Sequence, residues 1–219
     1  MNELANKTTD YLISIAKGVV GLCPVIGPMA AEAIGILIPQ QRLDRVAAFL
    51  EELDARVRIL DNDLETFSRN ARSDEGLEVL EDGLVQAGRS ASADRKERLA
   101  RLVAYSLTQD ELKYAETKKV LNLFRELTDP EVIWLVFYSL NPTLGRGLHS
   151  EFVEKHPEVL QPVSRAMSAP QDQRDRAALQ DSYKSTLARL GLVAQNGRAT
   201  QITALGRLVV RYVGDERSA

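Results

Sequence analysis

Hydrophobic positions recur at alternating spacings of three and four residues over a long stretch of the chain. The apolar positions of this run are Leu43, Val46, Leu50, Leu53, Val57, Leu60, Leu64 and Phe67. Such a repeat is typical of the buried seam of a bundle helix or of a coiled coil. We therefore predict one amphipathic helix over about residues 41–69, which packs in a bundle or, alternatively, forms an oligomeric coiled coil.

Two shorter amphipathic helices follow this run. The first begins at Ser73 or Asp74, either of which can cap the free amides of the first turn, and ends near Gly88. The second covers about residues 92–107 and has leucine and valine on one face and arginine and lysine on the other. Together with the N-terminal segment, these helices predict a helical bundle over residues 1–108.

The stretch before the long helix is strongly apolar. Residues 18–41 contain a single charge, Glu32, and approach the roughly 20 apolar residues that span a bilayer. Pro24, Pro28 and Pro39 divide the stretch into short pieces, because proline removes a backbone donor and clashes with the preceding turn.

Three interpretations of residues 18–41 remain open: a buried hairpin in the bundle, a segment that inserts into a membrane when triggered, and a constitutive span. For insertion and oligomerisation, the candidate residues are Gly18, Gly21, Gly27, Glu32, Ile34, Gly35 and Leu37. The first sixteen residues lack a basic leader, so we expect no export signal.

The second half, residues 109–219, is predicted to be helical up to a small β-hairpin. Asp129-Pro130 is a helix-start signal, and the proline-rich and glycine-rich stretch 141–170 favours loops. A helix over 172–190 is followed by two short apolar and polar runs around Asn196-Gly197, a pair typical of a hairpin turn, and by a last amphipathic helix. The fold class is mainly α.

The order helix, hairpin, helix over residues 172–213 resembles a winged-helix module. That resemblance implies a surface for DNA or for a protein partner, with Lys184, Arg189 and Arg198 as candidate contacts. Residues 170–219 carry a net charge of +3, but Asp175 and Asp181 lie on the same helix, so the sequence favours protein contact over DNA.

Composition excludes several classes of protein. The 219 residues are 44% hydrophobic and 27% charged, as in folded soluble proteins, and the single cysteine, Cys23, cannot form an intramolecular disulfide. His149 and His156 do not have the spacing of a zinc motif, and we expect them to be ordinary surface histidines. No phosphate-binding loop or nucleophile motif is present, so we expect no metal, no cofactor and no enzyme.

The combination of residues 18–39, the long helix from Arg42 to Phe67 and the terminal module resembles bacterial abortive-infection effectors with HeLo-like or Bell-like bundles. The resemblance implies a cytoplasmic antiviral protein of a pore-forming, toxin-like kind. It would bury residues 18–41 until a protein partner or another trigger causes it to self-associate and move to the inner membrane. The alternative is a soluble adaptor or transcriptional regulator that binds protein or DNA through residues 172–213.

Overall fold

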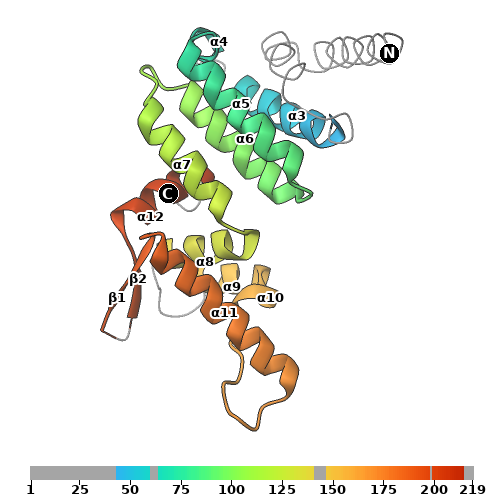
Figure 1. The fold of residues 1–219 in the computed structure, drawn as a ribbon, viewed down its shortest axis with the longest axis vertical. Helices are drawn as coiled ribbons and strands as arrows, with labels where there is room; N and C mark the ends of the chain where they lie inside the picture. The colour runs from blue at the N-terminus through green and yellow to red at the C-terminus, as the bar shows by residue number, and fades with distance from the viewer. Residues whose placement is uncertain (1–42, 60–63, 141–146, 198, 215–219) are drawn as a thin grey trace, which may run out of the picture. The chain divides into compact units, whose positions relative to one another are not determined.

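The computed structural model describes residues 43–59, 64–140, 147–197 and 199–214, and shows a mainly helical chain with one antiparallel two-strand hairpin near the C-terminus (Figure 1). The predicted fold class is confirmed. The chain packs as two compact units, Met1–Leu121 and Asn122–Ala219. The division therefore falls thirteen residues beyond the boundary predicted between 108 and 109.

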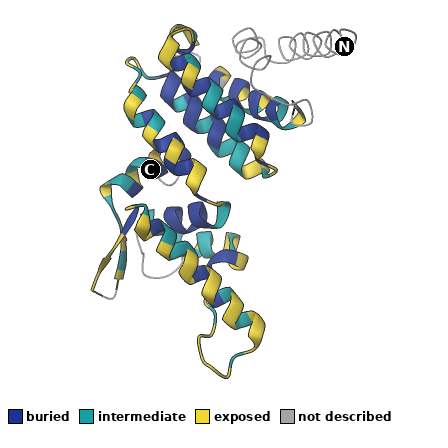
Figure 2. Cartoon of the chain, viewed as in Figure 1, coloured by how far each residue is buried: buried dark blue, intermediate teal, exposed yellow. Residues whose placement is uncertain are grey.

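In the described part of unit 1, four helices pack their apolar faces together in one core. They are α3 (Leu43–Ile59), α4 (Leu64–Ala71), α5 (Asp74–Arg89) and α6 (Ala93–Leu107). α3 packs on both α5 and α6, and the buried residues of these helices are coloured dark blue in Figure 2. Phe49 of α3 and Leu80, Leu84, Leu99 and Leu102 of its partners are all at 0% exposure. Burial of each such side chain favours folding by about 2 kcal/mol.

The seam predicted for the long helix is confirmed over α3 and corrected beyond it. Val46, Leu50, Leu53 and Val57 are at most 1% exposed. Leu64, assigned to the same seam, begins α4 and is 39% exposed, whereas Phe67 of α4 is fully buried. The apolar face of α4 therefore follows its own register. Leu60 and the side chain of Leu43 lie outside the described residues.

α5 and α6 begin where the sequence predicts. Ser73 Oγ accepts a hydrogen bond from the Gly76 amide at 3.0 Å, and Ser92 Oγ accepts one from the Arg95 amide at 3.2 Å. Each serine cap stabilises its helix by about 1 kcal/mol. Gly83 lets the two helices approach closely, since a Cβ there would lie 2.9 Å from Val103 Cγ2.

Charged side chains join α3 to α6 at the edge of the core. Arg56 Nη2 lies 2.8 Å from Glu97 Oε1 and 2.9 Å from Glu52 Oε1, and Arg101 Nη2 lies 3.2 Å from the same Glu97 oxygen. Arg101, on the arginine- and lysine-rich face of α6, therefore takes part in a mixed-charge network with Glu97 and Arg56. Because these side chains are partly solvated, the network contributes modestly to stability.

The helix α7 (Tyr114–Glu126) crosses the division between the units, and unit 2 continues with α8 (Asp129–Ser139). The sequence places the start of α8 one residue too late, with Asp129 as N-cap and Pro130 as the first helical residue. Thr128, and not Asp129, is the N-cap, because the carboxylate of Glu131 accepts hydrogen bonds from the Thr128 amide at 2.7 Å and from its hydroxyl at 2.8 Å. Pro130 occupies the first turn, as predicted.

The rest of unit 2 packs around α8. Two short helices, α9 (Leu148–Lys155) and α10 (Pro157–Leu160), precede the longest described helix, α11 (Gln171–Arg189). α8 contacts α9, α10, α11 and α12 (Ala204–Val213). Val132 and Leu135 of α8 are fully buried, so this helix is the centre of the unit.

The hairpin forms as predicted. β1 (Val193–Asn196) pairs antiparallel with β2 (Ala199–Ile202), with Val193 opposite Ile202 and Asn196 opposite Ala199. Gly197 in the turn has a φ of 62°, a left-handed conformation that favours glycine. α12 then begins with Thr203 Oγ1 accepting a hydrogen bond from the Gly206 amide at 3.0 Å.

Candidate functional site

The face of α8 that carries its aromatic residues is the most distinctive part of unit 2. Trp134 is 5% exposed, and its ring centroid lies 5.4 Å from that of Phe137 and 5.7 Å from that of Tyr138. The ring of His149 of α9 lies against that of Phe137 in a tilted arrangement, with 4.1 Å between ring centroids. We call Trp134, Phe137, Tyr138 and His149 the aromatic cluster.

Both histidines are packed against rings, and this corrects their assignment as ordinary surface residues. Besides the contact of His149 with Phe137, the ring of His156 lies 4.7 Å from that of Phe152. The His156 side chain is 12% exposed. Within the described residues no group of three or more histidine, cysteine, aspartate or glutamate side chains is arranged to hold a metal ion.

Lys184 of α11 covers the aromatic cluster. Its Nζ lies 4.3 Å from the centroid of the Trp134 ring, within the range of a cation–π interaction. The side chain is half-buried. Burial lowers the pKa of Lys184 below its ordinary value of 10.5, the positive charge of Arg165 lowers it further, and Asp181 partly opposes both effects.

The aromatic cluster also contains two polar groups, the Tyr138 hydroxyl and the Trp134 indole N–H. Burial raises the pKa of Tyr138 above its ordinary value of 10.0, and a hydrogen bond with Thr200 of β2 opposes this rise. The indole Nε1 of Trp134 is buried, and none of the described residues forms a hydrogen bond with it. A donor in this state carries a desolvation cost of about 1–3 kcal/mol.

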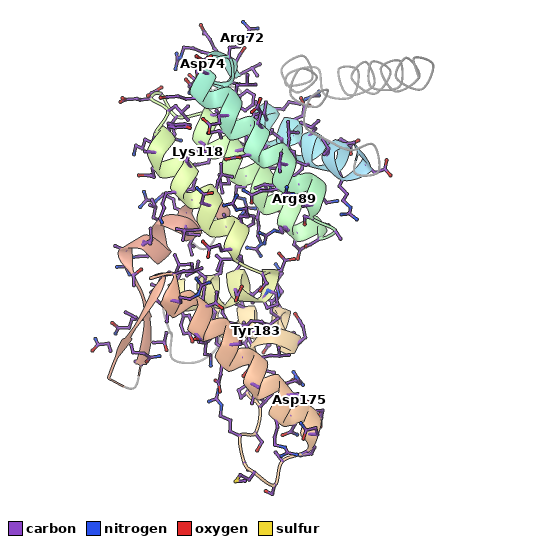
Figure 3. All side chains as sticks on the ribbon, in the orientation of Figure 1. Arg72, Asp74, Arg89, Lys118, Asp175 and Tyr183 are labelled. Atoms are coloured by element: carbon purple, nitrogen blue, oxygen red, sulfur yellow. The ribbon has the colours of Figure 1, made fainter. Side chains whose placement is uncertain are left out.

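Arg189, another candidate DNA or partner contact, pairs with an acidic residue of α7. Arg189 Nη1 lies 3.5 Å from Glu126 Oε2 and is exposed, and the side chain of Arg198 is outside the described part of the chain. Arg165, which the sequence did not single out, pairs with Asp181 of α11 at 2.5 Å. Acidic residues therefore pair with or lie among the basic residues of α11, which also carries Asp175 (labelled with Tyr183 in Figure 3).

Unit 1 holds a second group of charges, which the sequence analysis missed. We call Glu78, Asp82, Tyr114 and Lys118 the α5–α7 ion cluster. Lys118 Nζ lies 2.8 Å from Glu78 Oε1 and also contacts Asp82, and the Tyr114 hydroxyl donates to Glu78 (Figure 3 labels Lys118). The spacing of Glu78 and Asp82, four residues apart on one helix face, is the signal that could have suggested a shared partner.

The seven candidates for membrane insertion and oligomerisation, Gly18 to Leu37, lie outside the described residues. Among the helices that the structure does describe, none combines the length and the apolar character needed to cross a bilayer.

Searches against protein-family models, curated proteins and solved structures found no match to this chain.

Proposed function

We propose that this chain is a membrane-perturbing effector of the antiphage-defence type, which keeps residues 18–41 buried until a trigger causes it to self-associate. The observation that carries the proposal is that the chain changes at residues 42 and 43 from a nearly uncharged apolar stretch to an amphipathic helix. A 24-residue stretch with one charge leads directly into α3, a helix whose apolar face is buried against α5 and α6.

This arrangement supports a release mechanism. The contacts of α3 with α5 and α6 are made by residues after position 42, and the Arg56–Glu97 pair links α3 to α6. These contacts do not require the apolar segment to stay in place. A partner that binds the released state more tightly than the resting state then shifts the population toward release, by no more than the difference in its two affinities.

The test uses the full chain with single substitutions in the segment. Ile34→Asp places a charge in the apolar stretch, and Gly27→Leu fills a position where close backbone approach is expected. Both are expected to abolish toxicity on expression in bacteria and dye release from anionic liposomes, while far-UV circular dichroism stays unchanged. Leu148→Asp is the matched control, because Leu148 is 53% exposed on α9 and lies outside the segment.

Two outcomes would count against the effector. Toxicity equal to that of the wild type in both segment variants would show that residues 18–41 do not cause it by inserting into the membrane. Loss of helicity in Ile34→Asp, with full helicity in Leu148→Asp, would place the segment in the core of the fold.

A second candidate function is a protein-binding adaptor that acts through unit 2. Its support is the exposure of large apolar side chains, with Met167 at 94% and Leu179 at 52%. The pairing of Arg189 with Glu126 and the contact of Lys184 with Trp134 favour a protein partner over DNA.

Anisotropy titrations with duplex DNA separate the two forms of this alternative. An adaptor is expected to show no binding that weakens steeply with salt. Salt-dependent binding that is lost in Lys184→Gln and Arg189→Gln would instead establish a DNA-binding regulator.

A further inference from the structure

One exposed side of α11 carries charges of opposite sign near its two ends. Asp175, Leu179, Ser182 and Arg189 follow one another at spacings of four, three and seven residues, and all four are exposed. Residues at these spacings lie on one side of an α-helix. We call these four residues the α11 outer face, and Figure 2 shows exposed residues in yellow along this helix.

The two charges of the α11 outer face are only weakly engaged within the chain. Asp175 Oδ1 accepts a hydrogen bond from Gln171 Nε2 at 2.7 Å, and within the described residues this carboxylate forms no ion pair. Arg189 Nη1 lies 3.5 Å from Glu126 Oε2, with the two side chains 63% and 49% exposed. Because exposed pairs of this kind contribute little, both charges can pair with another molecule at small cost.

The middle of the face is arranged symmetrically between these charges. Asp175 and Arg189 are separated by about 21 Å along the helix axis, and Ser182 lies midway between them. Leu179 is 52% exposed beside this midpoint. Contact with a second surface would take this leucine out of water and so favour association.

We propose that the α11 outer face binds the same face of a second copy of this chain, with the two helices antiparallel and a two-fold axis at Ser182. Asp175 of each copy then lies opposite Arg189 of the other, so that one face provides two ion pairs. A parallel arrangement would instead bring Asp175 against Asp175 and Arg189 against Arg189. The face is therefore complementary to itself in one orientation, as the interface of a two-fold dimer requires.

The size of the contact sets the strength of the dimer. A single helix pair buries less than the roughly 1,600 Å² of a standard protein–protein interface, so we expect a weak dimer with a dissociation constant of about 100 μM. Salt should weaken it, since both ion pairs are formed by exposed side chains. The pairing concerns unit 2 and does not rest on the function proposed for residues 18–41.

Charge reversal tests the pairing in the full chain. Sedimentation equilibrium from about 10 μM to about 1 mM measures the dissociation constant. Asp175→Arg and Arg189→Asp should each weaken the dimer at least about tenfold, and the two changes together should restore it to within about threefold of wild type. Far-UV circular dichroism checks that each variant is folded.

Arg174→Asp is the matched control, because it makes the same charge change at an exposed residue of α11 that points about 100° away from Asp175 around the helix. It should change the dissociation constant by less than about twofold. A wild-type chain that stays monomeric over the whole concentration range would overturn the proposal. A dimer that both single reversals leave intact would also overturn it, and would place self-association elsewhere, for example in residues 18–41. A double variant that stays monomeric would contradict the opposed Asp175 and Arg189.

A cross-link provides a second readout that does not depend on charge. Ser182→Cys places a thiol at the proposed two-fold axis, where the two α-carbons approach within the about 7 Å that a disulfide allows. Mild oxidation should join this thiol to its counterpart in the second copy, as peptide mass spectrometry can map separately from any product of the native Cys23. Ser168→Cys, at an exposed position before α11, is the control and should give little cross-link. Equal cross-linking in the two variants, or none in Ser182→Cys, would contradict the pairing.

Discussion

Lys118 Nζ of α7 lies 2.8 Å from Glu78 Oε1 of α5, and the same ammonium contacts Asp82 one turn further along α5. One cation thus joins two carboxylates of a helix 36 to 40 residues away in sequence. The Lys118 side chain is 20% exposed, so its pairs are better shielded from solvent than an ordinary surface pair. The α5–α7 ion cluster therefore links α5 electrostatically to the part of α7 that lies in unit 1.

Replacing Lys118 by methionine should remove the electrostatic link between α5 and α7 and so destabilise the fold. The variant keeps most of the apolar stem but removes both ion pairs, and we expect the free energy of unfolding to fall by about 0.5–1 kcal/mol, because both carboxylates remain well solvated. Urea denaturation followed by circular dichroism measures the change. Lys119→Met is the matched control, since Lys119 is exposed on the same helix. A loss as large in the control would remove the special role of Lys118.

The same cluster predicts how stability depends on pH. Hydrogen bonds from Lys118 and Tyr114 lower the pKa of Glu78 below its ordinary value of 4.5. Its contribution is therefore complete above about pH 5 and is lost as the pH falls through the folded-state pKa. Burial alone would lower the pKa of Lys118, but hydrogen bonds to Asp82 and Glu78 outweigh burial and raise it above 10.5.

At the alkaline end, the hydrogen bond to Glu78 also raises the pKa of Tyr114 above 10.0. The contributions of Lys118 and Tyr114 are complete below their unfolded-state pKa values and are lost as the pH rises through the folded-state values. The stability difference between wild type and Lys118→Met should thus be constant from about pH 5 to pH 9 and shrink at both extremes. Urea midpoints measured from about pH 2 to pH 11 follow it, and a difference that does not shrink toward either extreme would contradict the assignment.

Local patterns in the sequence predicted most of the helices and the hairpin. The cap at Ser73 and the Asn196-Gly197 turn encode a local hydrogen bond and a left-handed residue, and the structure confirms both. The start of α8 was misplaced by one residue, because a Thr128–Glu131 capping box competes with the Asp129-Pro130 signal.

Local sequence patterns could not predict the contacts between residues that are distant in the chain. Trp134 and Lys184 are 50 positions apart, and no sequence pattern around either residue indicates that they are in contact. The histidines were misjudged for the same reason, since their ring partners are set by how α9 packs on α8. The exposure of Leu64 shows the limit of heptad counting, which cannot detect where one register ends and another begins.

Asn70 allows a test of a buried hydrogen-bonded contact between helices of unit 1. Its Nδ2 donates to the Leu107 carbonyl at 2.9 Å and to the Gln109 carbonyl at 2.8 Å, so it ties α4 to the C-terminal end of α6. Asn70→Ala leaves both carbonyls without this donor, and we expect a loss of about 2 kcal/mol in the free energy of unfolding. Arg72→Ala, at an exposed position nearby, should cost less than about 0.5 kcal/mol. Equal urea midpoints for the two variants would show that the Asn70 hydrogen bonds do not contribute to the free energy of unfolding.

Gly206 provides the sharpest steric test in unit 2. A Cβ at this position would lie 2.1 Å from the Leu192 carbonyl oxygen and 2.7 Å from Ile202 Cγ1, so the backbone of α12 would have to move away from the hairpin. That carbonyl also accepts hydrogen bonds from the Thr203 amide and hydroxyl, at 3.0 and 3.1 Å, and movement would weaken both.

We expect Gly206→Ala to lower the free energy of unfolding by about 2–3 kcal/mol, although alanine is the better helix former. Ala204→Ser, at the exposed first position of the same helix, should change it by less than about 0.5 kcal/mol. Urea denaturation followed by the fluorescence of Trp134, the single tryptophan, reports directly on unit 2. A Gly206→Ala protein as stable as wild type would mean that α12 does not approach the Leu192 carbonyl as closely as the structure has it.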